Sequence, residues 1–458
     1  MLIRKTFPLF LLLINLCIFS ASALQNAPAY YAKWKNSLMA DTSFFPIGVW
    51  LQEPSDAPAY KAAGVNLFIG LWAGPTAAQL QTLTSAGMKT ICDQNISLAA
   101  TYGSIIAGWM QNDEPDNAQS NGSGGYDPCI APATIQQYYS QWHTADTTRP
   151  IYMNLGRGVS DTGWYGRGTC TGHTEMYPEY IKGCDIVSYD IYPYTGSDAP
   201  VMNNPWYVAL GIDNLNRWSN NAKPAWCFIE CTQISATGTK PTPAQVKTMV
   251  WMALIHGAMG IEYFCHQFSP TTDTRAPLHD AAMLAGITAL NQRIISLAPV
   301  LNDSTRNNIV SVASSNTAVP VDRMVKVHGG NTYIFAASMR GGTATATFTM
   351  SGMTGTKSAE VLDEGRNVTV TNGVMSDAFS TYQVHLYKIA NSASTLAPRQ
   401  ENRVSGAGTR FGVIRTWSGI NEPVYDLKGN RMAVVKGKNG VYLITRADGG
   451  VTRVVMVW

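Results

Sequence analysis

The sequence predicts an α/β protein in which a (β/α)8 barrel, or TIM barrel, is followed by a small β-sandwich and a short C-terminal β-domain. Eight apolar, strand-like runs alternate with helix-like stretches over roughly 260 residues, which is the pattern and the size of such a barrel. After residue 299 the helical periodicity gives way to short β-rich runs, separated by turns that contain Gly and Asn. The predicted parts are a signal peptide (1–23), the barrel (24–303), the β-sandwich (304–391), a linker (392–402) and the C-terminal β-domain (403–458).

The predicted strands follow one another through the first part of the chain. They cover residues 44–50, 65–72, 88–95, 105–115, 150–156, 184–194, 223–233 and 260–268. Helices are predicted between them; residues 76–87, for example, begin with Thr76, which suits an N-cap, and end with Gly87, which suits a C-cap. An open, doubly wound sheet is the structural alternative, but no Gly-x-Gly-x-x-Gly turn follows the first strand.

Composition and charge exclude several classes of partner. Charged residues make up only 14% of the chain, the formal net charge is +3, and no basic stripe stands out, so we expect no nucleic-acid partner. The histidines are scattered and the cysteines lack paired C-x2-C spacing, so we expect no metal and no other cofactor.

The N-terminus has the features of a secretory leader. Arg4 and Lys5 precede an apolar run over residues 8–19, and Ala21 and Ala23 form a small-x-small cleavage site. The apolar run is too short to span a bilayer, and no later segment reaches about 18 uninterrupted apolar residues. We therefore expect no membrane span and a protein that is secreted or held at the cell surface.

Export permits disulfide bonds. Cys129, Cys170 and Cys184 lie in Gly-rich, loop-like surroundings and are the best candidates, with Cys170 and Cys184 able to close a short loop. The connectivity stays open at this point.

Two acidic residues end apolar strands. The run at 105–115 stops on polar residues that include Glu114, and the run at 223–233 stops at Glu230. In a barrel, catalytic groups are presented at the carboxyl ends of the strands, and two carboxylates are the minimum equipment for hydrolysing a glycosidic bond. The alternatives are a helix cap or an ion pair for Glu114, and a buried, structural acid for Glu230.

Other candidate residues lie at the ends of the remaining strands. The candidates for contact with a sugar are Trp50, Trp72, Asn154, Tyr194 and His266, because aromatic faces stack on sugar rings and an amide can bridge hydroxyls. Core packing is an equally good interpretation of each. Asp93 and Asp190 are interpreted as substrate contacts or as the proton-holding partner of Glu114, and Glu262, in the middle of a strand, as structural.

Three motifs resemble a known family. They are Asp113-Glu114-Pro115 after a Gly-Trp run, Glu230 after an apolar run, and Asp-Ile-Tyr-Pro-Tyr over residues 190–194. They resemble the retaining glycoside hydrolases of the largest barrel clan, clan A, and FSTYQVHLYKI (379–389) is similar to the end of the β-domain often appended to those barrels. The resemblance implies that Glu114 is the acid/base, that Glu230 is the nucleophile and that Tyr192 hydrogen-bonds the nucleophile.

The chain departs from the clan pattern at two places. Asp113 stands where the clan carries an Asn that binds the sugar 2-hydroxyl, so Asp113 itself or Asn112 would have to supply that contact, and the strand at 65–72 lacks the usual Arg. Residues 403–458 resemble a sorting domain of a bacterial outer-membrane secretion system, which implies bacterial secretion machinery as a partner. We predict a secreted retaining glycoside hydrolase acting on a β-linked polysaccharide or oligosaccharide; the alternative is a non-catalytic carbohydrate-binding or surface protein on the same barrel.

Overall fold

The structure is a computed structural model that describes residues 27–38, 40–161, 173–196 and 199–391, together with the C-terminal strands given below. The chain divides into two compact units, Met1–Ala393 and Ser394–Trp458. The predicted signal peptide (1–23) and linker (392–402) lie outside the described residues.

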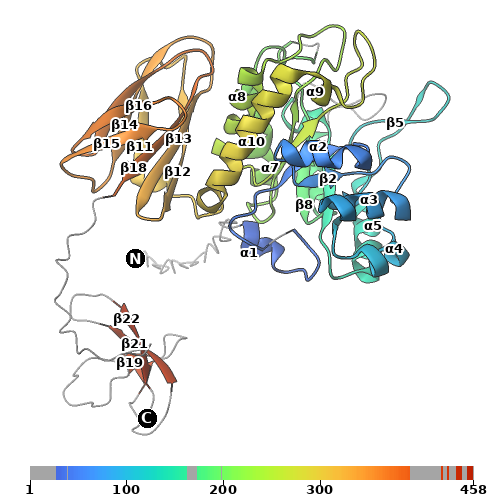
Figure 1. Cartoon of the computed structure of the whole chain (residues 1–458), viewed down its shortest axis with the longest axis horizontal. Helices are drawn as coiled ribbons and strands as arrows, with labels where there is room; N and C mark the ends of the chain where they lie inside the picture. The colour runs from blue at the N-terminus through green and yellow to red at the C-terminus, as the bar shows by residue number, and fades with distance from the viewer. Residues whose placement is uncertain are drawn as a thin grey trace, which may run out of the picture. The chain divides into compact units, whose positions relative to one another are not determined.

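Eight parallel strands form the barrel, which confirms the predicted fold class (Figure 1). They are β1 (Ile47–Trp50), β2 (Leu67–Ile69), β3 (Lys89–Cys92), β4 (Ile106–Met110), β7 (Ile151–Leu155), β8 (Ile186–Tyr189), β9 (Cys227–Glu230) and β10 (Ile261–Phe264). The strands pair in the order β8-β7-β4-β3-β2-β1-β10-β9, and a parallel bridge between Val187 and Ala225 joins the two ends of that order. The carboxyl ends of all eight strands therefore meet at one mouth.

Helices connect the strands and cover the sheet. The longer ones are α3 (Ala77–Ala86), α4 (Ile96–Tyr102), α5 (Pro132–Ala145), α7 (Trp206–Trp218), α8 (Pro243–Ile255) and α10 (Ala281–Leu301). Helix α3 has the predicted ends: the Thr76 side chain accepts a hydrogen bond from Gln79 N in a capping box, and Gly87 adopts the left-handed conformation that ends a helix. Helix α10 is long and apolar enough to cross a membrane by length and composition alone, but it packs against α8 and β12, and that packing accounts for its apolar face.

Bulky side chains fill the interior of the barrel. The rings of Trp50 and Phe228 pack edge to face at a centroid distance of 5.4 Å, and those of Tyr152 and Trp226 lie 5.8 Å apart. Glu262 is buried among them, and its Oε2 accepts a hydrogen bond of 2.7 Å from the Tyr152 hydroxyl. The interior is therefore a packed core and not a pore.

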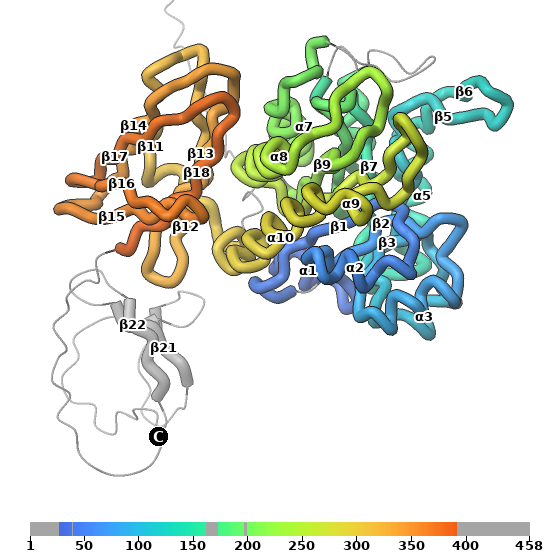
Figure 2. The backbone as a smooth tube through the Cα atoms, turned by 45° about the horizontal axis from the view of Figure 1, so that its top comes forward, coloured from blue at the N-terminus to red at the C-terminus, as the bar shows by residue number. Residues whose placement is uncertain are grey.

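An antiparallel β-domain follows the barrel (Figure 2). Its strands are β11 (Val310–Ser314), β12 (Val321–His328), β13 (Asn331–Ser338), β14 (Ala344–Met350), β15 (Thr356–Val361), β16 (Arg366–Thr371), β17 (Val374–Phe379) and β18 (Val384–Ala390). It packs on the barrel through α8, where the Trp251 and Phe335 rings lie 5.1 Å apart.

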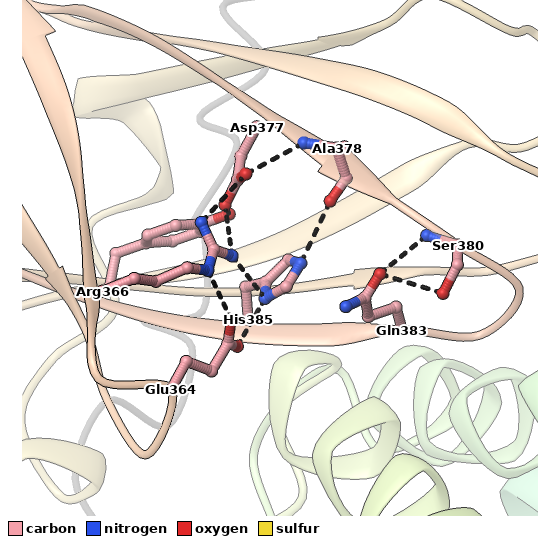
Figure 3. A network of polar contacts seen from close by, with 8 residues as sticks. Glu364, Arg366, Asp377, Ala378, Ser380, Gln383 and His385 are labelled. Atoms are coloured by element: carbon pink, nitrogen blue, oxygen red, sulfur yellow. Dashed lines mark hydrogen bonds and ion pairs between the residues drawn. The ribbon is translucent and has the colours of Figure 1, made fainter.

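A polar network ties the end of this β-domain together (Figure 3). Arg366 donates to Asp377 at 2.8 Å and to Glu364 at 2.8 Å, and His385 contacts the Ala378 carbonyl at 3.1 Å. These contacts join β16, β17 and β18. The polar side chains of this segment, His385 among them, therefore hold the strands of the β-domain together.

The C-terminal unit is described by its strands alone. These are β19 (Val424–Tyr425), β20 (Arg431–Met432), β21 (Gly440–Thr445) and β22 (Val451–Met456), which form an antiparallel sheet in the order β20-β19-β21-β22. The predicted β-rich character of residues 403–458 agrees with this sheet.

A disulfide between Cys170 and Cys184, one of the pairings that the sequence left open, does not form. Cys184 is a free thiol, buried next to α6 (Tyr177–Ile181), where its Sγ donates to the Ile181 carbonyl. Cys129 is disulfide-bonded, and Cys170 lies outside the described residues. Proximity in sequence misled the prediction, because the strand that begins just after Cys184 draws this residue into the core.

Candidate active site

Glu114 lies in a tight turn directly after β4. It adopts a φ of 42°, in the left-handed region that residues with a side chain rarely occupy, at a cost of about 1–2 kcal/mol. Two backbone hydrogen bonds hold the turn: Glu114 N donates to the Asn154 carbonyl at 3.1 Å, and Asn117 N donates to the Glu114 carbonyl at 3.0 Å. Strain of this kind persists only where the surroundings enforce it, and it is common at functional sites.

The residues after Glu114 fix its carboxylate. The Asn117 side chain is buried, and its Nδ2 donates to Glu114 Oε2 at 2.8 Å. Asp116 accepts from Gly156 N at 2.9 Å and from the Tyr177 hydroxyl at 3.0 Å, which ties the turn to β7 and α6. A Cβ at Gly156 would come within 2.6 Å of Asn117 Nδ2 and 3.2 Å of Glu114 Oε1, so only glycine leaves room for this pair.

Two further acids join Glu114 at the mouth. Asp113 has an exposed outer side, but protein atoms surround its carboxyl group, and its Oδ1 accepts a hydrogen bond of 3.0 Å from Asn154 Nδ2 on β7. Asp190, directly after β8, lies close enough to Glu114 and Tyr192 to interact electrostatically with both. Oδ1 of Asn154 and Oδ1 of Asp190 are buried and have no hydrogen-bond partner among the described residues. Unpaired polar atoms are rare in buried sites, so these two oxygens leave hydrogen-bonding capacity unused at the mouth.

The acids hold protons near neutral pH. Desolvation, followed by the charge of Glu114, raises the pKa of Asp113 to about 7, and the same two causes raise the pKa of Asp116 to about 7. Burial, followed by the charge of Glu114, raises the pKa of Asp190 well above its usual value. Asp190 therefore keeps a proton beside Glu114 near neutral pH. The mouth can therefore act as a proton donor at neutral pH.

Glu230 lies at the end of β9 in a different environment. Its exposed fraction is 0%, and both carboxyl oxygens accept hydrogen bonds: Oε1 from Tyr194 N at 2.6 Å, and Oε2 from Thr195 N at 2.8 Å and the Thr195 hydroxyl at 2.5 Å. Burial raises its pKa to about 7. These contacts anchor the loop after β8. The role of Glu230 as nucleophile stays a prediction. Tyr192, which the family resemblance places beside the nucleophile, contacts Asp190 and the Phe264 ring.

The remaining predicted residues divide between core and rim. Trp50 and Tyr194 are buried in the core, with exposed fractions of 6% and 5%. Trp72 stands 68% exposed after β2, and Asn112 is exposed beside Asp113. His266 is half-buried after β10, with Nε2 3.4 Å from the Leu51 carbonyl.

Sequence reasoning missed four residues of this site. Asp116 and Asn117 continue the polar run beyond Pro115, and that continuation was the available signal for a structured turn. Phe264 and Phe268 lie two residues before and after His266, so aromatic rings occupy every second position of Phe-Cys-His-Gln-Phe; that spacing was the available signal. Within the described part of the chain, no group of three or more His, Cys, Asp or Glu side chains is placed to hold a metal ion.

Replacing Asn117 with alanine is expected to lower kcat about 10–100-fold with little change in KM, because the side chain acts on the reaction by positioning the Glu114 carboxylate. Gly156→Ala should do the same by displacing Asn117. Steady-state kinetics on a responsive glycoside measures both. The matched control is Asn121→Ala, at an exposed position in the turn between β5 (Gln119–Ser120) and β6 (Tyr126–Asp127). A rise in KM with kcat unchanged would show that Asn117 binds substrate and does not position Glu114.

The free energy of unfolding is expected to fall by several kcal/mol between pH 5 and pH 7. Burial raises the folded-state pKa values of Asp116 and Glu230 to about 7 and of Glu262 to about 8. Across this range the folded state therefore binds more protons than the unfolded chain, and each such group removes about 1.4 kcal/mol per pH unit. Urea unfolding at several pH values measures the slope, which Glu262→Gln should make shallower. A slope that Glu262→Gln leaves unchanged would show that Glu262 titrates normally.

Comparisons with known proteins concern the fold. No protein-family model matches the chain, and no curated protein matches its sequence. AmyP in complex with maltotriose is 10% identical, over 79% of this chain and 99% of that chain, with a TM-score of 0.46. A family 30 subfamily 8 xylanase from Clostridium acetobutylicum is 12% identical, over 76% and 95%, with a TM-score of 0.41. An α-amylase from Geobacillus thermoleovorans complexed with acarbose is 10% identical, over 77% and 99%, with a TM-score of 0.39. No residue and no activity is carried over from these structures.

Proposed function

We propose that the protein hydrolyses β-glycosidic bonds in a polysaccharide or oligosaccharide with carboxyl groups at the mouth of its barrel. The observation that carries this proposal is the cluster of Asp113, Glu114 and Asp190 at the ends of β4 and β8, next to unpaired buried oxygens of Asn154 and Asp190. Several acids in mutual contact give the site both a proton donor and a carboxylate, which glycoside hydrolysis needs.

Each acid has a role in the proposed double displacement. Asp190 holds a proton in the resting site, and Glu114 takes this proton from Asp190 and passes it to the departing glycosidic oxygen. Asp113, partly exposed at the mouth and oriented by the Asn154 amide, attacks the anomeric carbon as the glycosidic bond breaks and forms a glycosyl-enzyme. Water, deprotonated by Glu114, then displaces Asp113 and restores both carboxyl groups.

The assignment of the nucleophile differs from the one that the family resemblance implies. Glu230 has no solvent access and would have to give up three hydrogen bonds to reach a sugar ring. Asp113 needs no rearrangement to meet a ligand at the mouth, which favours it as the attacking group. Retention of the anomeric configuration, followed by NMR of the first product, is expected for this course.

A carbohydrate-binding protein without catalysis is the second candidate. Two observations favour it. Glu230, which stands where the clan carries its nucleophile, is buried and out of reach of a ligand, and Asp113 stands where the clan carries an Asn. Such a protein would keep the mouth as a recognition site.

One experiment separates the two candidates. Purified protein is incubated with β-glucans, mannans, xylans and galactans, and new reducing ends are counted alongside retention on the insoluble polymers. New reducing ends on at least one polymer support the hydrolase, while retention without product supports the binder.

We also propose that the protein is exported, with bacterial secretion machinery as a partner of the C-terminal unit. N-terminal sequencing of protein from the culture medium tests export, and the sequence is expected to begin at Leu24.

A further inference from the structure

Four aromatic side chains pack together beside the carboxyl cluster, and we call this group the aromatic wall: Tyr192, Phe264, His266 and Phe268. The Tyr192 and Phe264 ring centroids are 5.2 Å apart, and the rings of Phe264, His266 and Phe268 contact one another at 5.5, 6.3 and 6.2 Å. The wall starts at the site, because Tyr192 lies beside Asp190, and it ends in solvent, because Phe268 is 52% exposed.

The backbone holds the wall in place. Phe268 N donates to the Gln233 carbonyl at 3.2 Å, and the Thr232 hydroxyl donates to the His266 carbonyl at 2.8 Å. These contacts join the loop after β10 to the loop after β9, so the rings meet a ligand without first having to be ordered. A surface fixed in this way loses little conformational entropy on binding.

The chemistry of the wall fits an uncharged ligand. Desolvation lowers the pKa of His266, so this ring is neutral at neutral pH, and no member of the wall carries a charge there. A ligand that follows the wall from the cluster into solvent therefore needs apolar faces for the rings and hydroxyls for the neighbouring polar groups, and sugar rings offer both.

We propose that the aromatic wall is a binding path for a neutral sugar chain that runs outward from the carboxyl cluster. The substrate is then a polymer, held over several sugar units on one side of the bond at the cluster. This inference rests on the proposed function for the class of ligand, and it adds which residues hold the chain and in which direction it leaves the site.

The test measures how binding depends on chain length. Dissociation constants are determined by calorimetry for neutral β-linked oligosaccharides of two to six units, taken from the polymer that responds in the panel. Phe268→Ala should weaken binding of the six-unit chain about tenfold and of the two-unit chain much less, because only the longer chain reaches the outer ring. Phe264→Leu, which keeps an apolar side chain in a half-buried position, should have an intermediate effect. Ile295→Ala, an exposed apolar side chain on α10, is the matched control and should change nothing.

The outcomes separate this inference from the proposed function. One possible result is that the wild-type protein binds long chains tightly and releases no product, while Phe268→Ala loses the preference for long chains. This result supports the wall and refutes the hydrolase. A protein that hydrolyses the polymer, and whose Phe268→Ala variant keeps the wild-type dependence on chain length, supports the hydrolase and overturns the wall. Equal weakening at every chain length also overturns the wall, because it would show a local change and not the loss of an outer contact.

Discussion

Replacing Glu114 with glutamine is expected to lower kcat by about 10²–10⁴-fold while the protein keeps its fold. The substitution preserves the shape of the side chain and its contact with Asn117, but it removes the proton that the departing oxygen needs. Steady-state kinetics on the polymer from the panel measures the loss, and the urea midpoint checks that the fold is intact.

The dependence on the leaving group makes this prediction sharper. An aryl glycoside whose phenol leaves without protonation should suffer much less in Glu114→Gln than the natural polymer does. Glu53→Gln, an exposed acid in the loop after β1, provides the matched control and should keep full activity. If Glu114→Gln loses the same factor on both kinds of substrate, the side chain is not the proton donor. If it keeps more than a tenth of the wild-type kcat, Glu114 has no catalytic role.

Replacing Glu230 with alanine is expected to reduce the free energy of unfolding by about 3–5 kcal/mol. The change leaves two backbone N–H groups, of Tyr194 and Thr195, and one hydroxyl without an acceptor in a fully buried place, and each such loss costs about 1–3 kcal/mol. Urea unfolding at pH 6 gives the number. Glu230→Gln, which keeps one acceptor oxygen, should cost less.

The same variant distinguishes the two roles considered for Glu230. A nucleophile can be removed at little cost in stability, and activity then falls by orders of magnitude in a normally folded protein. If Glu230 instead anchors the loop after β8, its replacement by alanine causes a large loss in the free energy of unfolding. If Glu230→Ala unfolds at the wild-type urea midpoint and is inactive, the nucleophile is Glu230, as the family resemblance implies, and Asp113 is not.

The order of strands and helices could be predicted because it depends on local patterns. Alternation of apolar runs with amphipathic stretches indicated the barrel, and Thr76 and Gly87 marked the ends of α3. The polar stop after the β4 run correctly placed Glu114 at the mouth. Each of these inferences uses residues that are neighbours along the chain, where propensity, capping and periodicity act.

Environments that depend on distant segments could not be predicted in this way. Glu230 is sealed by backbone N–H groups of a turn that follows another strand, and nothing in the residues around Glu230 indicates those donors. Trp50 looked like a sugar platform at a strand end, but Phe228 from β9 covers it inside the barrel. The contact between Asp190 and Glu114 likewise joins β8 to β4. Such features depend on which side chains the closed barrel brings together.

A crystal structure of the Glu114→Gln variant with an oligosaccharide from the responsive polymer would show which carboxyl groups meet the bond that is cleaved. We expect a glycosidic oxygen within hydrogen-bond distance of the residue 114 side chain and the adjoining anomeric carbon facing Asp113, while Glu230 keeps its contacts with Tyr194 and Thr195. A sugar ring in contact with Glu230, with Asp113 turned away from the ligand, would show that Asp113 is not the nucleophile.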